Sequence, residues 1–425
     1  MENILLIIFV AGYILITLEH PIKVNKAATA LITGVLCWTL LVLSSADSHH
    51  INEELTAHLG ELSGILFYLL GAMTIVELID AHNGFDIITA RIKQTDKRRL
   101  LWIIAFLTFF LSAVLDNLTT TIVIISLLRK LVQKQNDRLI FAGIVVIAAN
   151  AGGAWSPIGD VTTTMLWIGG QITTANIILK LIVPSLVCLI VPLLILSVRF
   201  KGTTEKPGAT EVKSDAAYSE KQQIVVFTSG VLILILVPVF KTLTHLPPYM
   251  GILIGLGILW VITEIMHREK EAKHKQMLSV SKALQKIDTP SILFFLGILL
   301  SIAALQSSGI LAKLAGWLSS HLANENITVL SLGFISAIVD NVPLVAAAQG
   351  MYDLAQYPTD HYFWEFLAYC TGTGGSTLII GSAAGVAAMG MEKIDFFWYL
   401  KKISVLAVAG YLSGAMVYII QGLIL

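Results

Sequence analysis

Long apolar runs separated by short charged segments fill most of the chain. A helix needs roughly 20 mostly apolar residues to cross a bilayer. Runs of about this length predict membrane-spanning helices at residues 3–19, 27–45, 62–81, 139–169, 176–198, 223–240, 249–266, 289–307, 363–390 and 394–424. The pattern therefore predicts an all-α polytopic membrane protein.

Two further apolar segments, 100–133 and 327–355, are interrupted by nearly the same motif. It reads Ser-Ala-Val-Leu-Asp-Asn at 112–117 and Ser-Ala-Ile-Val-Asp-Asn at 336–341. An ionisable group at membrane depth is costly, and by default it indicates a functional site. We expect each segment to be a re-entrant helical hairpin folded about its Asp-Asn pair. The alternative is two complete spans joined by a polar loop.

The distribution of Lys and Arg indicates the orientation, because cytoplasmic loops carry the positive excess. With the N-terminus outside, all of the 28 basic residues except Lys180, Lys241 and Lys313 fall on the cytoplasmic side. This orientation requires each hairpin to begin and end on the same side of the membrane. The first hairpin enters from the cytoplasm, and the second enters from outside. Both termini are then expected on the periplasmic side of a cell inner membrane.

Similar motifs recur in the two halves of the chain. Residues 65–69 resemble 292–296, and glycine-rich breaks follow the hairpins at 150–154 and 371–376. We expect two inverted repeats, residues 1–201 and 223–425, each with five spanning segments and one hairpin. Residues 202–222 would form a cytoplasmic linker. Inverted repeats with broken helices meeting near the midplane are typical of secondary transporters.

Composition supports the membrane assignment and excludes several other classes. The chain is 56% hydrophobic and 13% charged, with a mean hydropathy of +0.80, far from the values of soluble domains. A net charge of zero gives no basic excess for nucleic acid. The three cysteines lie singly in apolar runs, without metal or redox spacing, and are expected to pack in the core. No cofactor and no enzymatic activity are expected.

The four predicted helix breaks hold the candidate chemistry, because irregular backbone at membrane depth must be buried or line a cavity. Their carboxylate, amide and hydroxyl oxygens could replace the water shell of a small cation. The candidate cation ligands are Asp116, Asn117, Thr120, Asn150, Ser156, Asp160, Asp340, Asn341 and Thr373. Thr119, Thr120 and Thr121 could equally bond back to their own helix.

The sign of the charge in these breaks favours a cationic substrate. They contain acids but no Lys or Arg, so an organic dianion would find no fixed cation, whereas an alkali cation suits oxygen ligands. If Asp116 and Asp340 approach each other, they would titrate as a coupled pair for which proton and cation compete. Asp160 and Glu77 are further candidates for carrying protons. Glu77 and Asp80 also fit an interfacial location facing water.

Residues 115–121 (Leu-Asp-Asn-Leu-Thr-Thr-Thr) and 150–164 (Asn-Ala-Gly-Gly-Ala-Trp-Ser-Pro-Ile-Gly-Asp-Val-Thr-Thr-Thr) resemble those of NhaD-type sodium/proton antiporters. These belong to the ion transporter superfamily, which also contains citrate, arsenite and dicarboxylate carriers. The resemblance implies exchange of Na+ or Li+ for H+ in pH homeostasis. It also implies a homodimer and an elevator-like movement of the hairpin-bearing domain past a scaffold. The second half departs from the first because it has no Asp at the position of Asp160.

Two other functions use the same residues differently. A sodium-coupled carrier of an organic or oxyanion substrate would keep the fold and use Asp116 and Asp340 only for the coupling ion. An intramembrane aspartyl protease would use them as a hydrolytic dyad. A purely structural role for the buried acids is disfavoured because no basic partner is visible in the spans.

Overall fold

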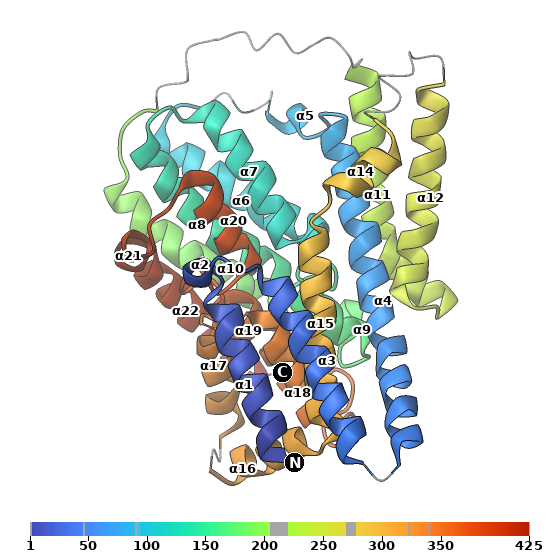
Figure 1. The fold of residues 1–425 in the computed structure, drawn as a ribbon. Coiled ribbons are helices and arrows are strands. Elements are labelled where there is room, and N and C mark those ends of the chain that lie inside the picture. The colour runs from blue at the N-terminus through green and yellow to red at the C-terminus, as the bar shows by residue number, and fades with distance from the viewer. Residues whose placement is uncertain are drawn as a thin grey trace.

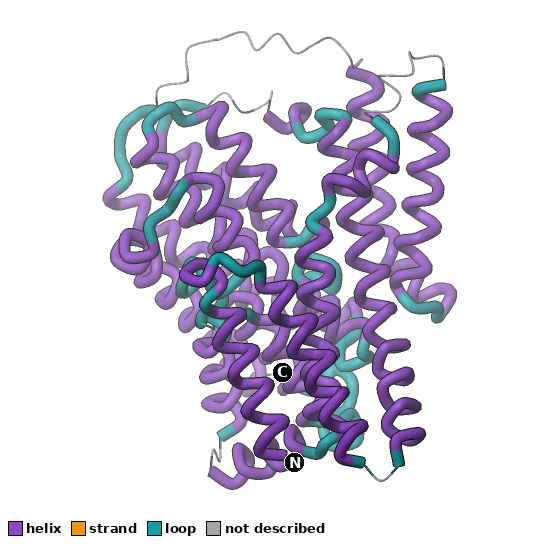
Figure 2. Tube along the Cα trace, viewed as in Figure 1, coloured by secondary structure: helices purple, strands orange, loops and turns teal. Residues whose placement is uncertain are grey.

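The computed structural model describes residues 2–45, 47–89, 92, 94–204, 220–268, 278–321, 324–338 and 340–424. These residues form helices joined by short loops (Figure 2). Among them are nine helices long and apolar enough to cross a membrane, which confirms the all-α polytopic fold. Most of the predicted linker lies outside the described residues, as do some of the basic residues used for orientation: Arg91, Lys93, Lys206, Lys213, Lys270, Lys273 and Lys275.

One set of helices, which we call the α4 group, packs around the long helix α4. In Figure 1, α4 runs beside α11 and α12 along one side of the molecule. The group consists of α1 (Glu2–Thr17), α2 (Glu19–Ile22), α3 (Lys26–Ser44), α4 (Ser48–Ala81), α11 (Glu220–Thr244), α12 (Pro248–Met266), α14 (Val280–Lys286) and α15 (Thr289–Ser307). The short helix α5 (Asp86–Thr89) follows α4.

The other set, the α8 group, packs around α8 (Gln135–Ala154). Every residue of α8 from Phe141 to Ala154 is buried, as expected for an apolar helix enclosed by protein. Around it lie α6 (Lys97–Leu115), α7 (Asn117–Leu131), α9 (Val161–Ile168), α10 (Thr174–Arg199), α17 (Glu325–Ile335), α18 (Asn341–Met351), α19 (Tyr362–Gly374), α20 (Ala383–Glu392), α21 (Phe396–Tyr399), a π-helical turn (Leu400–Ser404) and α22 (Val405–Ile424). Helix α16 (Ile310–His321) contacts both α15 and α18.

Both Asp-Asn motifs interrupt a helix where the sequence predicts a break. Asp116 separates α6 from α7 with a φ of 78°, a backbone conformation that costs a non-glycine residue about 1–3 kcal/mol. Helix α17 ends at Ile335, and Asp340 precedes α18. The outer ends of α6 and α7 lie at one end of the molecule, and those of α17 and α18 lie at the other (Figure 1).

The two glycine-rich breaks are built alike. Helix α8 ends at Ala154 and α9 begins after its N-cap Asp160, whereas α19 ends at Gly374 and α20 begins after its N-cap Ser382. A Cβ on the residue before either cap would collide with a hairpin backbone: Gly159 with Ser112 and Ala113, and Gly381 with Ala337. The division into inverted repeats at residues 201 and 223 stays a prediction.

Helix α4 is longer than the sequence pattern predicts. The apolar pattern predicts this helix only over residues 62–81, but α4 begins at Ser48. The side chain of Asp47 accepts hydrogen bonds from the backbone N–H groups of His49 and His50. Pairs four residues apart, His49 with Glu53 and His50 with Glu54, lie on the same face of the helix. N-capping and these pairs allow a polar segment to stay helical. The run at 3–19 forms only the 16-residue α1, which is short for a span.

Glu392 joins three helices of the α8 group. Its side chain is 2% exposed and accepts hydrogen bonds from Nε of Arg129 on α7 at 2.7 Å and from Nε of Arg138 on α8 at 3.1 Å. Arg129 also donates to the carbonyl of Met391. This ion-pair cluster holds the C-terminus of α20 against α7 and α8.

Replacing Glu392 with Gln should lower the thermal stability of the protein. The substitution removes the anion between two guanidinium groups, and hydrogen bonds to charged groups contribute about 1.5–3 kcal/mol. Size-exclusion chromatography of detergent-solubilised protein after heating would show aggregation at a lower temperature. Glu53→Gln, at an exposed pair on α4, is the matched control and should leave the aggregation temperature unchanged. Equal stability of Glu392→Gln and wild type would contradict the role assigned to the cluster.

Candidate ion-binding site

A small cavity lies where three of the helix breaks meet. Its volume is about 60 Å³, and its polar lining includes Asp116, Asn117, Asp160, Asp340 and Asn341. The three aspartates are the N-caps of α7, α9 and α18. Helix N-termini favour nearby anionic groups, so the fold provides a setting in which ionised carboxylates can be held close together. We call this cavity the ion pocket.

Asp116 is held at the start of α7 by Thr119. Its Oδ1 accepts a hydrogen bond from the backbone N–H of Thr119, and its Oδ2 accepts one from the Thr119 hydroxyl, both at 2.8 Å. Both carboxylate oxygens are therefore fixed in orientation. Each oxygen has further acceptor capacity, so Asp116 can bind a cation without giving up these bonds.

Asp160 is connected to the first hairpin through Asn117. The Asn117 side chain donates to Oδ2 of Asp160 at 3.2 Å and to Oδ1 of Asn150 at 3.0 Å. Oδ1 of Asp160 accepts a hydrogen bond from the backbone N–H of Thr162. Asn117, Asn150 and Asp160 are each at most 3% exposed. Together they link α7, α8 and the start of α9.

The second half of the chain enters the same network through serines. The Asn150 side chain donates to the hydroxyls of Ser376 and Ser382, each at 2.9 Å. Ser382 precedes α20 as Asp160 precedes α9, so a hydroxyl occupies the place of a carboxylate. We did not select either serine as a site residue from the sequence. The signal that could have identified Ser382 is its position directly after Gly381, which matches Gly159-Asp160.

Lys26 contradicts one expectation from the sequence. We expected no basic residue at the helix breaks and no basic partner for the buried acids, but Nζ of Lys26 lies 3.3 Å from Oδ2 of Asp340. Lys26 starts α3 and also lines the ion pocket, although the orientation rule counts it with the cytoplasmic loops. Its long side chain reaches a residue remote in sequence, which no local pattern reveals. The pocket is therefore lined by three carboxylates and one ammonium group.

The remaining candidate ligands lie at varying distances from the pocket. The hydroxyls of Ser156, Thr373 and Thr121 donate to the carbonyls of Ala113, Tyr369 and Asn117, respectively. Ser156, Thr373 and Asn150 are absent from the described lining of the pocket. Thr120 is likewise absent from this lining, although its hydroxyl is fully buried and has no hydrogen-bond partner among the described residues.

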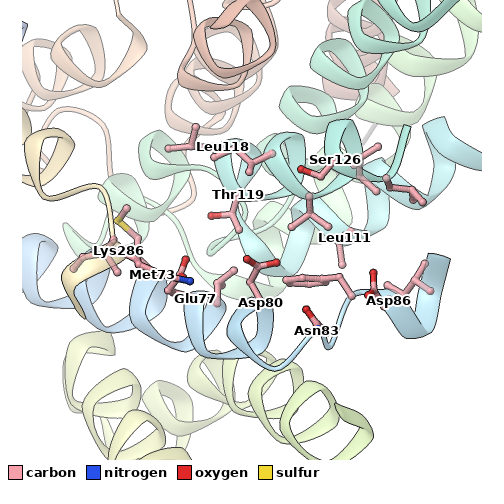
Figure 3. Close-up of a pocket in the computed structure, with 18 of the residues that line it drawn as sticks. Met73, Glu77, Asp80, Asn83, Asp86, Leu111, Leu118, Thr119, Ser126 and Lys286 are labelled. Atoms are coloured by element: carbon pink, nitrogen blue, oxygen red, sulfur yellow. The ribbon is translucent and has the colours of Figure 1, made fainter. Parts of the chain in front are cut away.

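A larger cavity of about 300 Å³ adjoins the ion pocket. The two share the lining residues Met73, Leu118 and Thr119. Figure 3 shows Glu77 and Asp80 of α4 on one wall of this cavity and Thr119 of α7 facing them. Glu77 is paired with Lys286 at 3.1 Å. This acidic cavity, with α5 and α14 beside it, lies next to the ion pocket.

The other end of the molecule has a separate cavity of about 730 Å³. Its lining includes His58 and Glu61 of α4, Met165 and Gly169 at the end of α9, and Gln349 of α18. Within the described residues, it has no lining residue in common with the ion pocket. Of these two larger cavities, only the one beside α5 and α14 shares lining residues with the ion pocket, so the conformation is asymmetric. The pocket also shares Leu69, Met73, Asp116 and Val161 with a smaller cavity of about 20 Å³.

Comparison with known proteins identifies the family. Residues 13–372 match the sequence model of a family described as citrate transporter, CitMHS. The chain belongs to the CitMHS family. This CitMHS-family protein is 49% identical over 416 residues to sodium/proton antiporter 1 of Arabidopsis thaliana, covering 97% of this chain and 71% of the relative. It is 48% identical over 419 residues to sodium/proton antiporter 2 of the same plant, covering 97% and 98%.

Bacterial relatives extend the comparison. The Na(+)/H(+) antiporter NhaD of Alkalimonas amylolytica is 30% identical over 441 residues, covering 97% of this chain and 89% of the relative. The resemblance to NhaD-type antiporters expected from the sequence is confirmed. The CitMHS-family protein is a multi-pass membrane transporter and not an enzyme, so the aspartyl protease alternative is set aside. The names of its relatives support cation/proton antiport.

Proposed function

We propose that this protein exchanges Na+ or Li+ for H+ across the membrane, with cation and protons competing for the carboxylates of Asp116, Asp160 and Asp340. The observation that carries the proposal is the ion pocket itself. Three carboxylates and the side chains of Asn117 and Asn341 line a cavity of about 60 Å³. Such a space suits a small cation held by oxygen atoms and is too small for a hydrated organic anion.

The hydrogen bonds around the pocket suggest how exchange occurs. Thr119 orients Asp116, and Asn117 orients Asp160, so both carboxylates are positioned before a cation arrives. A bound cation favours their ionised forms, whereas its departure leaves close negative charges that favour protonation. Glu77, in the adjoining cavity, is proposed to pass protons to or from solution when its contact with Lys286 opens.

Lys26 adds a competing internal cation to this scheme. Its ammonium group neutralises part of the charge on Asp340 and lies 4.3 Å from the centre of the Phe294 ring. A sodium ion that uses Asp340 as a ligand must weaken this ion pair. Lys26 therefore limits the affinity for the cation and helps to release it.

Packing between the halves supports the proposed inverted repeats and the elevator-like movement. Helix α20 of the second half packs on α7 of the first hairpin, and α9 of the first half packs on α18 of the second hairpin. The Ser112 hydroxyl donates to the carbonyl of Ala149, and the Ser336 hydroxyl donates likewise to Thr371. The two serine contacts are equivalent within their own halves, as expected for repeats, whereas the helix contacts join the halves. We propose that they hold the α8 group together as one body that moves against the α4 group.

Assembly and orientation complete the proposal. We place the acidic cavity beside α5 and α14 on the cytoplasmic side, because basic residues such as Lys97, Arg129 and Lys286 lie at that end. Both termini would then be periplasmic in a bacterial inner membrane. The homodimer implied by the resemblance to NhaD is part of the same proposal.

Sodium-coupled transport of an organic anion is the second candidate. The family description as citrate transporter and the presence of Lys26 in the pocket favour it. In this scheme Lys26 would bind a substrate carboxylate, and the aspartates would hold only the coupling ion.

Proton movement in reconstituted vesicles distinguishes the two candidates. Addition of Na+ or Li+ to vesicles containing the purified protein should move protons, because cation and proton compete for the same carboxylates. Citrate should cause no movement and should not be taken up in a sodium gradient. Potassium is tested in parallel to define selectivity. Sodium-driven uptake of labelled citrate without sodium-driven proton movement would overturn the proposal in favour of the carrier.

The variant Lys26→Met separates the two roles of this residue within the same assay. For cation exchange, loss of the competing ammonium should lower the sodium concentration needed for half-maximal proton movement. For an anion carrier, the same substitution should abolish citrate uptake. Lys313→Met, at an exposed pair with Glu2, is the matched control.

A further inference from the structure

Helix α9 connects the ion pocket to the α4 group. It contains only eight residues, Val161–Ile168, and its N-cap Asp160 lines the pocket. At its other end, Nζ of Lys241 donates to the carbonyl of Trp167 at 2.6 Å. Nε2 of Gln349 donates to the carbonyl of Met165 at 3.2 Å. Two side chains from different helices therefore bind the C-terminal carbonyls of α9.

The position of Lys241 differs from that of an ordinary lysine near the end of a membrane helix. Such lysines usually extend their charge toward water or lipid head groups. Lys241 lies in the last turn of α11 and is half-buried. Its ammonium group lies 4.4 Å from the centre of the Trp167 ring, and Trp167 is 1% exposed. In the part of the chain that the structure describes, its contacts are a carbonyl and an indole face rather than a carboxylate.

A positive charge is well placed at the C-terminus of a helix. The last carbonyls of α9 accept hydrogen bonds from the backbone N–H groups after the helix, that of Met165 from Gly169 and that of Trp167 from Gly170. A carbonyl oxygen can accept a second bond, and the helix dipole favours a cation there. A hydrogen bond from a charged donor is stronger than one between neutral groups. The Lys241 contact is therefore an attractive interaction between α9 and α11, beyond the packing of apolar side chains.

This contact crosses the boundary between the two groups of helices. Helix α9 packs with α18 and α19 in the α8 group, and α11 packs with α4 and α12 in the α4 group. Two other lysines also make contacts across this boundary or beside it, Lys26 with Asp340 and Lys130 with Asp86 at 2.7 Å. If the α8 group slides past the α4 group, the hydrogen bond between Lys241 and Trp167 has to break.

We propose that Lys241 is a latch that holds α9, and with it the α8 group, in the conformation whose ion pocket adjoins the cavity beside α5 and α14. The inference rests on the proposed function, because a latch matters only if the groups move during exchange. Lys241 is a positioning residue, since it acts through α9 on Asp160 at the other end of the same short helix. Release of the latch and rearrangement of the ion pocket are then coupled by a rigid helix.

Labelling of an introduced cysteine tests the latch. Ser126 is exposed and lines the cavity beside α5 and α14, between α4 and α7 (Figure 3). In purified Ser126→Cys protein, a polar maleimide should react quickly at this site. The native Cys37, Cys188 and Cys370 are all buried, so labelling of the protein without Ser126→Cys gives the background rate. Adding Lys241→Met should slow labelling by about tenfold, because a charge-assisted hydrogen bond that favours the open cavity is lost.

Two further variants make the result specific. Lys241→Arg keeps the positive charge, the hydrogen-bond donors and the ability to lie over an indole face, so labelling should stay within about twofold of the parent. Lys313→Met removes a lysine from an exposed pair and should have no effect. If Lys241→Met makes the native cysteines reactive, the fold is damaged and Lys241→Gln is measured instead, with slower labelling expected again. Labelling of a folded Lys241→Met or Lys241→Gln variant at the parental rate would overturn the proposal.

The exchange assay separates failure of the latch from failure of the proposed function. In Lys241→Met, sodium-dependent proton movement should change several-fold in its maximal rate, its half-saturating sodium concentration or both, because the latch sets the population of the conformation that binds sodium from the cavity beside α5 and α14. Both quantities at their parental values would contradict the latch. Absence of proton movement in the wild type would refute sodium/proton exchange, whereas the labelling result would still test Lys241.

Discussion

Vesicles containing Asp116→Asn should show no sodium-dependent dequenching of a pH-sensitive dye above the level of vesicles without the protein. Asn keeps the size of the side chain and caps a helix about as well as Asp, so α7 should still begin at residue 117. The amide has no negative charge with which to hold Na+, and it cannot exchange a proton. The measurement is made in everted vesicles over a range of sodium concentrations, with the amount of protein in the membrane checked in parallel.

Asp96 provides a matched control for this experiment. It is the N-cap of α6, and its side chain accepts a hydrogen bond from the backbone N–H of Arg99. Asp96→Asn therefore makes the same change at the start of the other helix of the hairpin, away from the ion pocket. It should retain exchange. Retention of exchange by Asp116→Asn at a rate near wild type would remove Asp116 from the site.

Asp340→Asn is a less direct test than Asp116→Asn. It is also expected to abolish exchange, but it leaves Lys26 without its carboxylate partner. Loss of activity would then reflect either a missing ligand or an uncompensated ammonium group in the pocket. The double variant Lys26→Met, Asp340→Asn resolves this ambiguity, because activity should stay absent if the carboxylate itself is required.

Asp160→Ser should also eliminate exchange while keeping the local fold. Serine is a good N-cap, and the chain already uses Ser382 as the cap at the corresponding position before α20. The substitution makes the first break resemble the second, so it removes the carboxylate while α9 stays capped. The loss should appear in sodium-dependent dequenching at every sodium concentration tested.

The same Asp→Ser substitution at another helix N-cap tests whether altered capping alone explains the loss of ion exchange. Asp395 caps α21 by accepting a hydrogen bond from the backbone N–H of Trp398, and it is exposed. Asp395→Ser should leave both stability and exchange close to wild type. If Asp160→Ser keeps half or more of the wild-type rate, Asp116 and Asp340 would suffice and Asp160 would be a structural cap.

The helix breaks were accessible from sequence because their causes are local. Asp116 and Asp340 stand in apolar runs where an ionisable group is costly, and glycines before Asp160 mark a close approach of backbones. Their convergence in one cavity was expected from the recurrence of the motif. The amide and serine network was less accessible, because Asn150 could be paired with Ser376 and Ser382 only after α8 and the start of α20 had been brought together.

The amino-acid sequence by itself determined the membrane-embedded helical class, the places where helices break, and the acids that these breaks contain, since each follows from hydrophobicity and backbone preference over a few residues. Only the tertiary structure decided which charges face each other. Lys26 reaches Asp340 across 314 positions of the chain, and Lys241 reaches the end of α9 from another helix. A lysine side chain is long and flexible, so its partner depends on how distant helices pack. The residues next to it in the sequence therefore do not reveal that partner.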